Sequence, residues 1–156
     1  MDFALSEEQT ALRDLAGQIL SEQLPPERLR DIDAGGDWFA ADTWAELAKA
    51  DLLGISLPEA HGGGGYGFFE LALVLEQVGR NVAPLPALAT LVLGALPIAE
   101  FGTDEQQAAW LPGVIDGSVV LTAGLSEGAD GLPPEVPATT ATRSGDGWTI
   151  RGTKHL

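Results

Sequence analysis

The chain has 156 residues, of which 45% are hydrophobic, and a formal net charge of −15. This length suggests one domain, or one domain with part of another, and is enough to bury a sizeable core. The negative charge repels phosphate groups, so neither nucleic acid nor an anionic membrane surface is an expected partner. The sequence contains no cysteine, which excludes disulfides and thiolate chemistry and fits a reducing compartment such as the cytoplasm.

Two stretches bear on targeting and membrane insertion. Residues 1–9 are acidic, whereas a signal peptide begins with basic residues followed by apolar ones. Residues 82–99 are uncharged, but they contain Pro84, Pro86, Gly94 and Pro97. A membrane span needs about 20 clean apolar residues, so a helix buried within a bundle is expected here.

Helix signals fill residues 1–117. Ser6 with Gln9, and Thr103 with Gln106, have the spacing of capping boxes, which predict two helix starts. Two prolines follow Leu24 and predict the end of the first helix. About six helices are expected: Ser6 to Leu24, Pro26 to Ile32, Asp42 or Thr43 to Gly54, Phe68 to Gly79, Ala87 to Leu96, and Thr103 to Ile115.

The pattern changes to β near residue 119. A buried strand is expected over 119–125, and a hairpin from strands at 138–143 and 148–153, because an Asp-Gly pair separates two β-prone runs. The expected fold is therefore mainly α, with a helical domain at 1–117 followed by an incomplete small β domain at 118–156. Two or three strands leave open edges and an uncovered face, so either the gene product is cut here or another chain completes the sheet.

Patterns for catalysis and metal binding are weak. Residues 62–65 are all glycine but lack G-K-S/T and G-x-G-x-x-G, so a flexible turn is expected rather than a phosphate loop. His61 and His155 lie too far apart for any recognised metal-ligand spacing, and no metal site is expected. Glu70 and Glu76 do not have i, i+4 spacing and are interpreted as a solvated helix edge rather than an acid–base pair.

Five segments, in order along the whole chain, resemble the amino-terminal part of the acyl-CoA dehydrogenases. They are M-D-F-A-L-S-E-E-Q-T-A-L-R-D, L-L-G-I-S-L-P-E-A-H-G-G-G-G, F-G-T-D-E-Q-Q-A-A-W-L-P, V-V-L-T-A-G-L-S-E and D-G-W-T-I-R-G-T-K. The family's fold implies a helical amino-terminal domain, a middle β domain and a carboxy-terminal four-helix domain. By this resemblance, the chain holds the first domain and only the beginning of the second.

The resemblance also implies a flavin site. It assigns contacts with the flavin ring of FAD to four consecutive residues, Ala123, Gly124, Leu125 and Ser126. Their backbone N–H groups would stabilise negative charge on the reduced ring. The family then usually continues P-G-A-G-S-D, whereas residues 128–133 read G-A-D-G-L-P, with Leu132 at the serine that contacts the phosphate side. We therefore expect this chain alone to bind FAD weakly or not at all.

No catalytic residue is expected in this chain, because the family's base is a glutamate of the carboxy-terminal domain. The altered loop at 128–133, with the run N-V-A-P-L-P-A-L-A-T before it, most resembles actinobacterial paired-subunit members, which oxidise bulky acyl-CoA thioesters such as those of steroid side chains. In the family, a helix matching residues 85–93 partly lines the acyl pocket. Leu85, Pro86 and Ala89 are small or plain apolar there and would leave room for a bulky tail, although simple core packing explains them equally well.

Two functions therefore remain open from the sequence. In the first, the chain is part of a FAD-dependent acyl-CoA dehydrogenase that acts on an acyl-CoA thioester and assembles with a second subunit or with copies of itself. In the second, it is a non-catalytic partner subunit that has kept only the scaffold and does not hold FAD. Either way, the chain alone is expected to be inactive.

Overall fold

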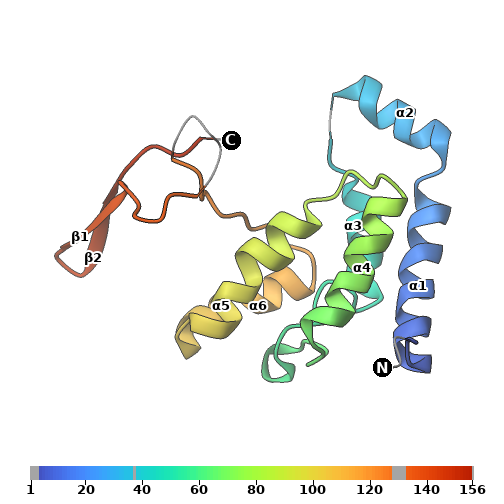
Figure 1. Ribbon diagram of the computed structural model, residues 1–156, viewed down its shortest axis with the longest axis horizontal. Helices are drawn as coiled ribbons and strands as arrows, with labels where there is room; N and C mark the ends of the chain where they lie inside the picture. The colour runs from blue at the N-terminus through green and yellow to red at the C-terminus, as the bar shows by residue number, and fades with distance from the viewer. Residues whose placement is uncertain (1–3, 37, 128–132, 156) are drawn as a thin grey trace. The chain divides into compact units, whose positions relative to one another are not determined.

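A computed structural model describes residues 4–36, 38–127 and 133–155. Contacts divide the chain after Thr122 into two compact units. The first unit is helical and the second contains a two-stranded β-hairpin (Figure 1). The described residues therefore form a mainly α protein with six α-helices, which confirms the predicted fold class. Within these residues, no helix has the length and apolar character needed to cross a membrane.

The helices of the first unit begin where local capping signals favour them. They are α1 (Glu7–Gln23), α2 (Pro26–Gly35), α3 (Ala41–Lys49), η1 (Glu59–His61, 3₁₀), α4 (Phe68–Arg80), η2 (Leu88–Ala95, π), α5 (Leu96–Phe101) and α6 (Asp104–Ile115). Both predicted capping boxes form: Ser6 Oγ accepts from the Gln9 N–H at 3.1 Å, and Thr103 Oγ1 from the Gln106 N–H at 3.3 Å. Each box satisfies two N–H groups that would otherwise lack partners at a helix start.

Helix α2 is longer than its sequence predicts. It begins at Pro26, whose fixed φ suits the first helical position, but it continues past Ile32 to Gly35. Gly36 then adopts a φ of 74° and its N–H donates to the Asp33 carbonyl. A glycine ends the helix here because the left-handed conformation costs it little.

Helix α3 differs from its prediction at both ends. Ala40 occupies the N-cap position without a side-chain hydrogen bond, so neither Asp42 nor Thr43 caps the helix. Asp42 lies in the first turn instead and forms an ion pair with Arg28 of α2 at 2.5 Å. The helix ends at Lys49, well before the expected stop at Gly54.

The core lies between the helices of the first unit. Helix α1 packs against α4 and α3, and α6 packs against α5 and η2 (Figure 1). The largest fully buried side chains include Trp44, Leu20, Leu47, Leu71, Leu91 and Leu111. Because burying one such leucine contributes about 1.5–3 kcal/mol, this cluster supplies most of the drive to fold the first unit.

The predicted helix at 87–96 forms, but its larger part is the π-helix η2, followed directly by α5. Pro97 lies at the start of α5 and has no N–H to close an α-helical hydrogen bond. On η2, the Thr90 hydroxyl donates to the Leu121 carbonyl at 3.0 Å. A Cβ added at Gly94 would lie only 2.5 Å from the Leu121 Cβ, so glycine permits the close approach of this segment.

The prediction of a buried strand at 119–125 is wrong. These residues have no strand structure, and Val120 is 48% exposed. The run is apolar because Val119 and Leu121 pack against the helical core, with the Val119 N–H bound to the Gly113 carbonyl at 2.8 Å. Among the described residues, β structure begins at Thr140 rather than near Val119.

The predicted hairpin forms, but its strands span 140–144 and 147–151 rather than 138–143 and 148–153. Strands β1 (Thr140–Ser144) and β2 (Gly147–Arg151) pair antiparallel, with Ser144 opposite Gly147. The two turn residues are Gly145 and Asp146, and Gly145 has a φ of 60°. A glycine at the first turn position is typical of a tight hairpin turn that matches the strand twist. Trp148 and Ile150 stay exposed on one face of the hairpin.

Candidate functional site

The four residues assigned to flavin contacts, Ala123, Gly124, Leu125 and Ser126, lie at the start of the second unit. They form no strand, and Gly124 and Leu125 are exposed. Within the described parts of the chain, the N–H groups of Ala123, Gly124 and Leu125 have no hydrogen-bond acceptor. Backbone N–H groups without an acceptor are the kind of donor that a flavin ring can bind, so this segment is chemically compatible with FAD.

Glu127 follows this segment directly and anchors it. Its Oε1 accepts from Lys154 Nζ at 2.6 Å and from the Thr139 N–H at 3.1 Å, and its Oε2 accepts from the Ala138 N–H. The Lys154 ammonium is the largest cause that lowers the pKa of Glu127 to about 2, and hydrogen bonds from Thr139 and Ala138 add to it. The carboxylate is therefore ionised under all ordinary conditions.

Sequence reasoning did not single out Glu127. Two features of the sequence could have indicated its role: its position beside the flavin segment and the presence of a lysine, Lys154, in the G-T-K motif. The neighbouring Ser126 carbonyl accepts from the His155 N–H at 3.0 Å. The departure from the family pattern at 128–132, including Leu132, lies outside the described residues.

The residues assigned to the acyl pocket are only partly brought together. Leu85 and Pro86 line an open groove of about 540 Å³ in the first unit, together with Trp38, Phe39, Pro84 and Val120. Its volume falls within the range of small-molecule sites, and its walls are mainly apolar. Ala89 is half-buried on η2 and is not one of the described residues that line this groove. The groove can therefore hold an apolar group beside Leu85 and Pro86.

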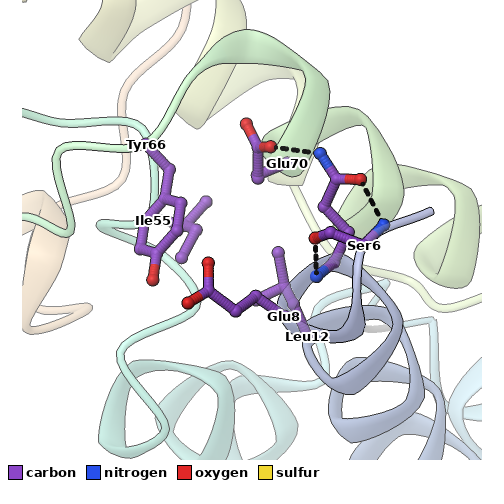
Figure 2. Close-up of a pocket in the computed structure, with 7 residues that line it drawn as sticks. Ser6, Glu8, Leu12, Ile55, Tyr66 and Glu70 are labelled. Carbon is purple, nitrogen blue, oxygen red and sulfur yellow. Dashed lines mark hydrogen bonds between the residues drawn. The ribbon is translucent and has the colours of Figure 1, made fainter.

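A smaller pocket of about 160 Å³ lies where α1 meets the start of α4 (Figure 2). Gln9 Nε2 donates to Glu70 Oε1 at 2.8 Å, and Glu70 Oε2 accepts from the Gly67 N–H at 3.1 Å. The hydrogen bond from Gln9 is the main cause that holds the pKa of Glu70 below its usual value. The pocket is smaller than a site for a drug-sized ligand, and these polar groups bind one another.

The other polar residues considered from sequence have structural contacts. Glu70 is not a solvated edge, because it joins α1 to α4, whereas Glu76 is exposed and lies 3.6 Å from Arg80. His61 Nε2 lies 3.2 Å from Gln107 Oε1 of α6. In the described residues, no group of three or more acidic or histidine side chains could hold a metal ion.

Residues 6–118 match the family model described as acyl-CoA dehydrogenase, N-terminal domain. The chain therefore belongs to the acyl-CoA dehydrogenase family. Acyl-CoA dehydrogenase FadE12 of Mycobacterium tuberculosis is 40% identical over 115 residues, which cover 73% of this chain and 30% of that protein.

Two solved structures extend the similarity through the second unit. A variant of the Tcur3481-Tcur3483 steroid ACAD is 46% identical with a TM-score of 0.85, and the match covers 95% of this chain and 40% of that one. The ChsE4-ChsE5 complex from Mycobacterium tuberculosis is 30% identical with a TM-score of 0.87, and the match covers 99% of this chain and 41% of that one. This chain thus spans less than half the length of these relatives.

Proposed function

We propose that this chain supplies the helical amino-terminal domain, residues 1–117, and the start of the middle β domain, residues 118–156, of a cytoplasmic FAD-dependent acyl-CoA dehydrogenase. The reaction is the α,β-dehydrogenation of an acyl-CoA thioester. The observation that carries this proposal is the family match over 6–118, joined to the backbone N–H groups of Ala123, Gly124 and Leu125, which have no acceptor among the described residues.

In that role, bound FAD would supply the hydride-acceptor chemistry for the thioester Cβ, and a carboxylate elsewhere in the enzyme would take the Cα proton. The N–H groups of residues 123–125 would donate to the flavin ring, and the Ser126 hydroxyl would add a further polar contact. Fixed donors of this kind stabilise charge at little reorganisation cost. The family's base belongs to its carboxy-terminal domain, so we expect no turnover from this chain alone.

The proposed substrate is a bulky acyl-CoA thioester, and the proposed partner is a second acyl-CoA dehydrogenase subunit or another copy of this chain. Support comes from the open apolar groove beside Leu85 and Pro86. Further support comes from the relatives, since one is named a steroid ACAD and another a complex of two proteins. A wide groove suits a fused-ring tail better than a short acyl chain, because the ring system can fill it and displace water.

Tryptophan fluorescence tests the groove. Trp38 lines it and is 68% exposed, so a steroid-side-chain acyl-CoA is expected to change the emission of the wild-type chain, whereas acetyl-CoA is not. Trp38→Phe should remove most of this change. Trp110→Phe is the matched control, because Trp110 is 47% exposed and lies on α6 outside the groove. Equal responses from both variants would refute the acyl site.

The second candidate is a non-catalytic partner subunit that does not hold FAD. The observation in its favour is the sequence G-A-D-G-L-P at 128–133, where the family has P-G-A-G-S-D. Equilibrium dialysis with FAD separates the two functions when a purified paired subunit is added. FAD retained only by the complex and lost with Gly124→Pro would favour the flavin-holding role, whereas retention insensitive to this variant would favour the scaffold role.

A further inference from the structure

The carboxylate of Glu127 binds two segments that are distant in sequence. Its donors are the N–H groups of Ala138 and Thr139, just before β1, and the Lys154 ammonium, just after β2. The side chain is only 8% exposed, so water competes little for these bonds. Three donors converge on one carboxylate. An ionised carboxylate has only hydrogen-bond acceptors, so it can accept from all three donors at once.

These contacts fix the residues next to the free donors. Because the Ser126 carbonyl also accepts from the His155 N–H, two consecutive residues, 126 and 127, are tied to the segments that flank the hairpin. A Cβ added at Gly124 would lie 3.1 Å from Lys154 Cγ, so the lysine stem also packs against the segment. The backbone at 124–127 is therefore held by packing at residue 124 and by hydrogen bonds at residues 126 and 127.

We propose that Glu127 is a positioning residue for the flavin: its carboxylate holds the Ala123–Ser126 backbone in the orientation that presents free N–H donors to the ring. This inference rests on the proposed FAD-dependent function. In this proposal, the orientation of the segment that faces the flavin ring depends on Glu127 and Lys154 rather than on the altered sequence at 128–133. Preorganised donors bind better than mobile ones, because ordering them at binding costs conformational entropy.

Amide NMR of the 156-residue chain, titrated with millimolar FAD, tests the proposal. In the wild type, the amides of Gly124 and Leu125 should shift as FAD is added. Glu127→Gln replaces one acceptor oxygen by an NH₂ group that faces the N–H donors, and the apparent FAD affinity should fall roughly tenfold. Glu135→Gln is the control, because Glu135 is an exposed residue of the same unit and the substitution removes the same charge.

A second pair of variants separates positioning from a general structural role. Lys154→Met should raise the pKa of Glu127, which is measured from its carboxyl NMR resonance. The pH at which the FAD-induced shifts are lost should rise by the same amount. Lys154→Arg keeps the cation and should restore both midpoints. The hairpin amides at Thr142 and Thr149 report whether each variant stays folded, since these residues pair across the strands.

Each outcome is decisive. Shifts lost in Glu127→Gln but kept in Glu135→Gln, with the hairpin intact, would support the proposal. The positioning role alone would be overturned by FAD-induced shifts that persist in Glu127→Gln. It would also be overturned if, in Lys154→Met, the pH at which these shifts are lost did not follow the pKa of Glu127. No FAD-induced shift at Gly124 or Leu125 in the wild type would overturn the inference, whereas FAD retention by the paired complex tests the proposed function separately.

Discussion

The close contact between Gly94 of η2 and Leu121 can be tested by adding a single methyl group. In Gly94→Ala the new Cβ would lie 2.5 Å from the Leu121 Cβ, whereas carbon atoms in contact are normally about 3.5–4.0 Å apart. The segment at 118–122 or the helix must therefore move by about 1 Å. Overpacking of this kind costs about 1–3 kcal/mol, against a gain of about 0.5–1 kcal/mol from replacing a helical glycine by alanine.

The net expectation for Gly94→Ala is a loss of about 0.5–2 kcal/mol in the free energy of unfolding. Gly79→Ala is the matched control, because Gly79 lies in α4 and a Cβ there would meet nothing within 4 Å. That variant should be more stable than the wild type by about 0.5–1 kcal/mol. The difference between the two variants isolates the cost of the contact, since the glycine term is common to both.

Urea unfolding followed by circular dichroism at 222 nm reports on the helical unit. With a denaturant slope near 2 kcal/mol/M, the midpoints of the two variants should differ by about 1 M. Leu121→Gly removes the opposing Cβ, so adding it to Gly94→Ala should cost less than adding it to the wild type. Equal midpoints for Gly94→Ala and Gly79→Ala would refute the close approach of residue 121 to η2.

Three further perturbations test separate contacts. Thr103→Ala removes the α6 cap and should cost about 1 kcal/mol in urea unfolding, and no loss would show that the box does not form in solution. Thr90→Val removes the hydrogen bond to Leu121 and should cost about 1 kcal/mol and speed exchange of the Val119 amide, whereas unchanged exchange would argue against this anchor. Because folding lowers the pKa of Glu127 from 4.5 to about 2, its contribution to the second unit is full above about pH 4.5 and is lost as the pH falls towards 2. Hairpin amide shifts followed by NMR should move over this window, and their invariance would contradict the Glu127 contacts.

Much of the helical unit could be predicted because its boundaries depend on local chemistry. The boxes at Ser6 and Thr103 and the proline after Leu24 act within one helical turn, and the structure has each of them where the sequence placed it. The turn at Gly145 is equally local. Signals of this range need no knowledge of tertiary contacts.

The failures share a different cause. The apolar run at 119–125 fits a buried strand and a segment packed on helices equally well, and only the contact with η2 decides between them. Similarly, Asp42 has the chemistry of an N-cap, but an ion pair with Arg28 and a helix start at Ala41 place it in the first turn. Neither outcome is visible in a short window of sequence.

The assignment of flavin contacts to residues 123–126 comes from the resemblance and stays a prediction. Among the described residues, the N–H groups of Ala123, Gly124 and Leu125 lack an acceptor, but the resemblance gave no role to Glu127. Its partners lie 11 to 27 residues away, at Ala138 and Lys154. Because these donors are distant in sequence, a local window cannot distinguish Glu127 from an exposed acidic residue.

The two proposed functions differ in whether this chain contacts FAD, and the ring and the diphosphate of that cofactor can be considered separately. FAD has a ring and a diphosphate, and binding both parts through one molecule multiplies their separate affinities. Under the proposed function, the N–H groups of residues 123–125, which lack an acceptor among the described residues, would face the ring beside an ionised Glu127, whereas Leu132 stands at the position of the family's phosphate-side serine. A chain of this composition would hold free FAD poorly and still orient the ring of a flavin whose phosphates another subunit binds. Weak binding by the chain alone, together with ring-side amide shifts, is therefore the combination that a paired assembly requires.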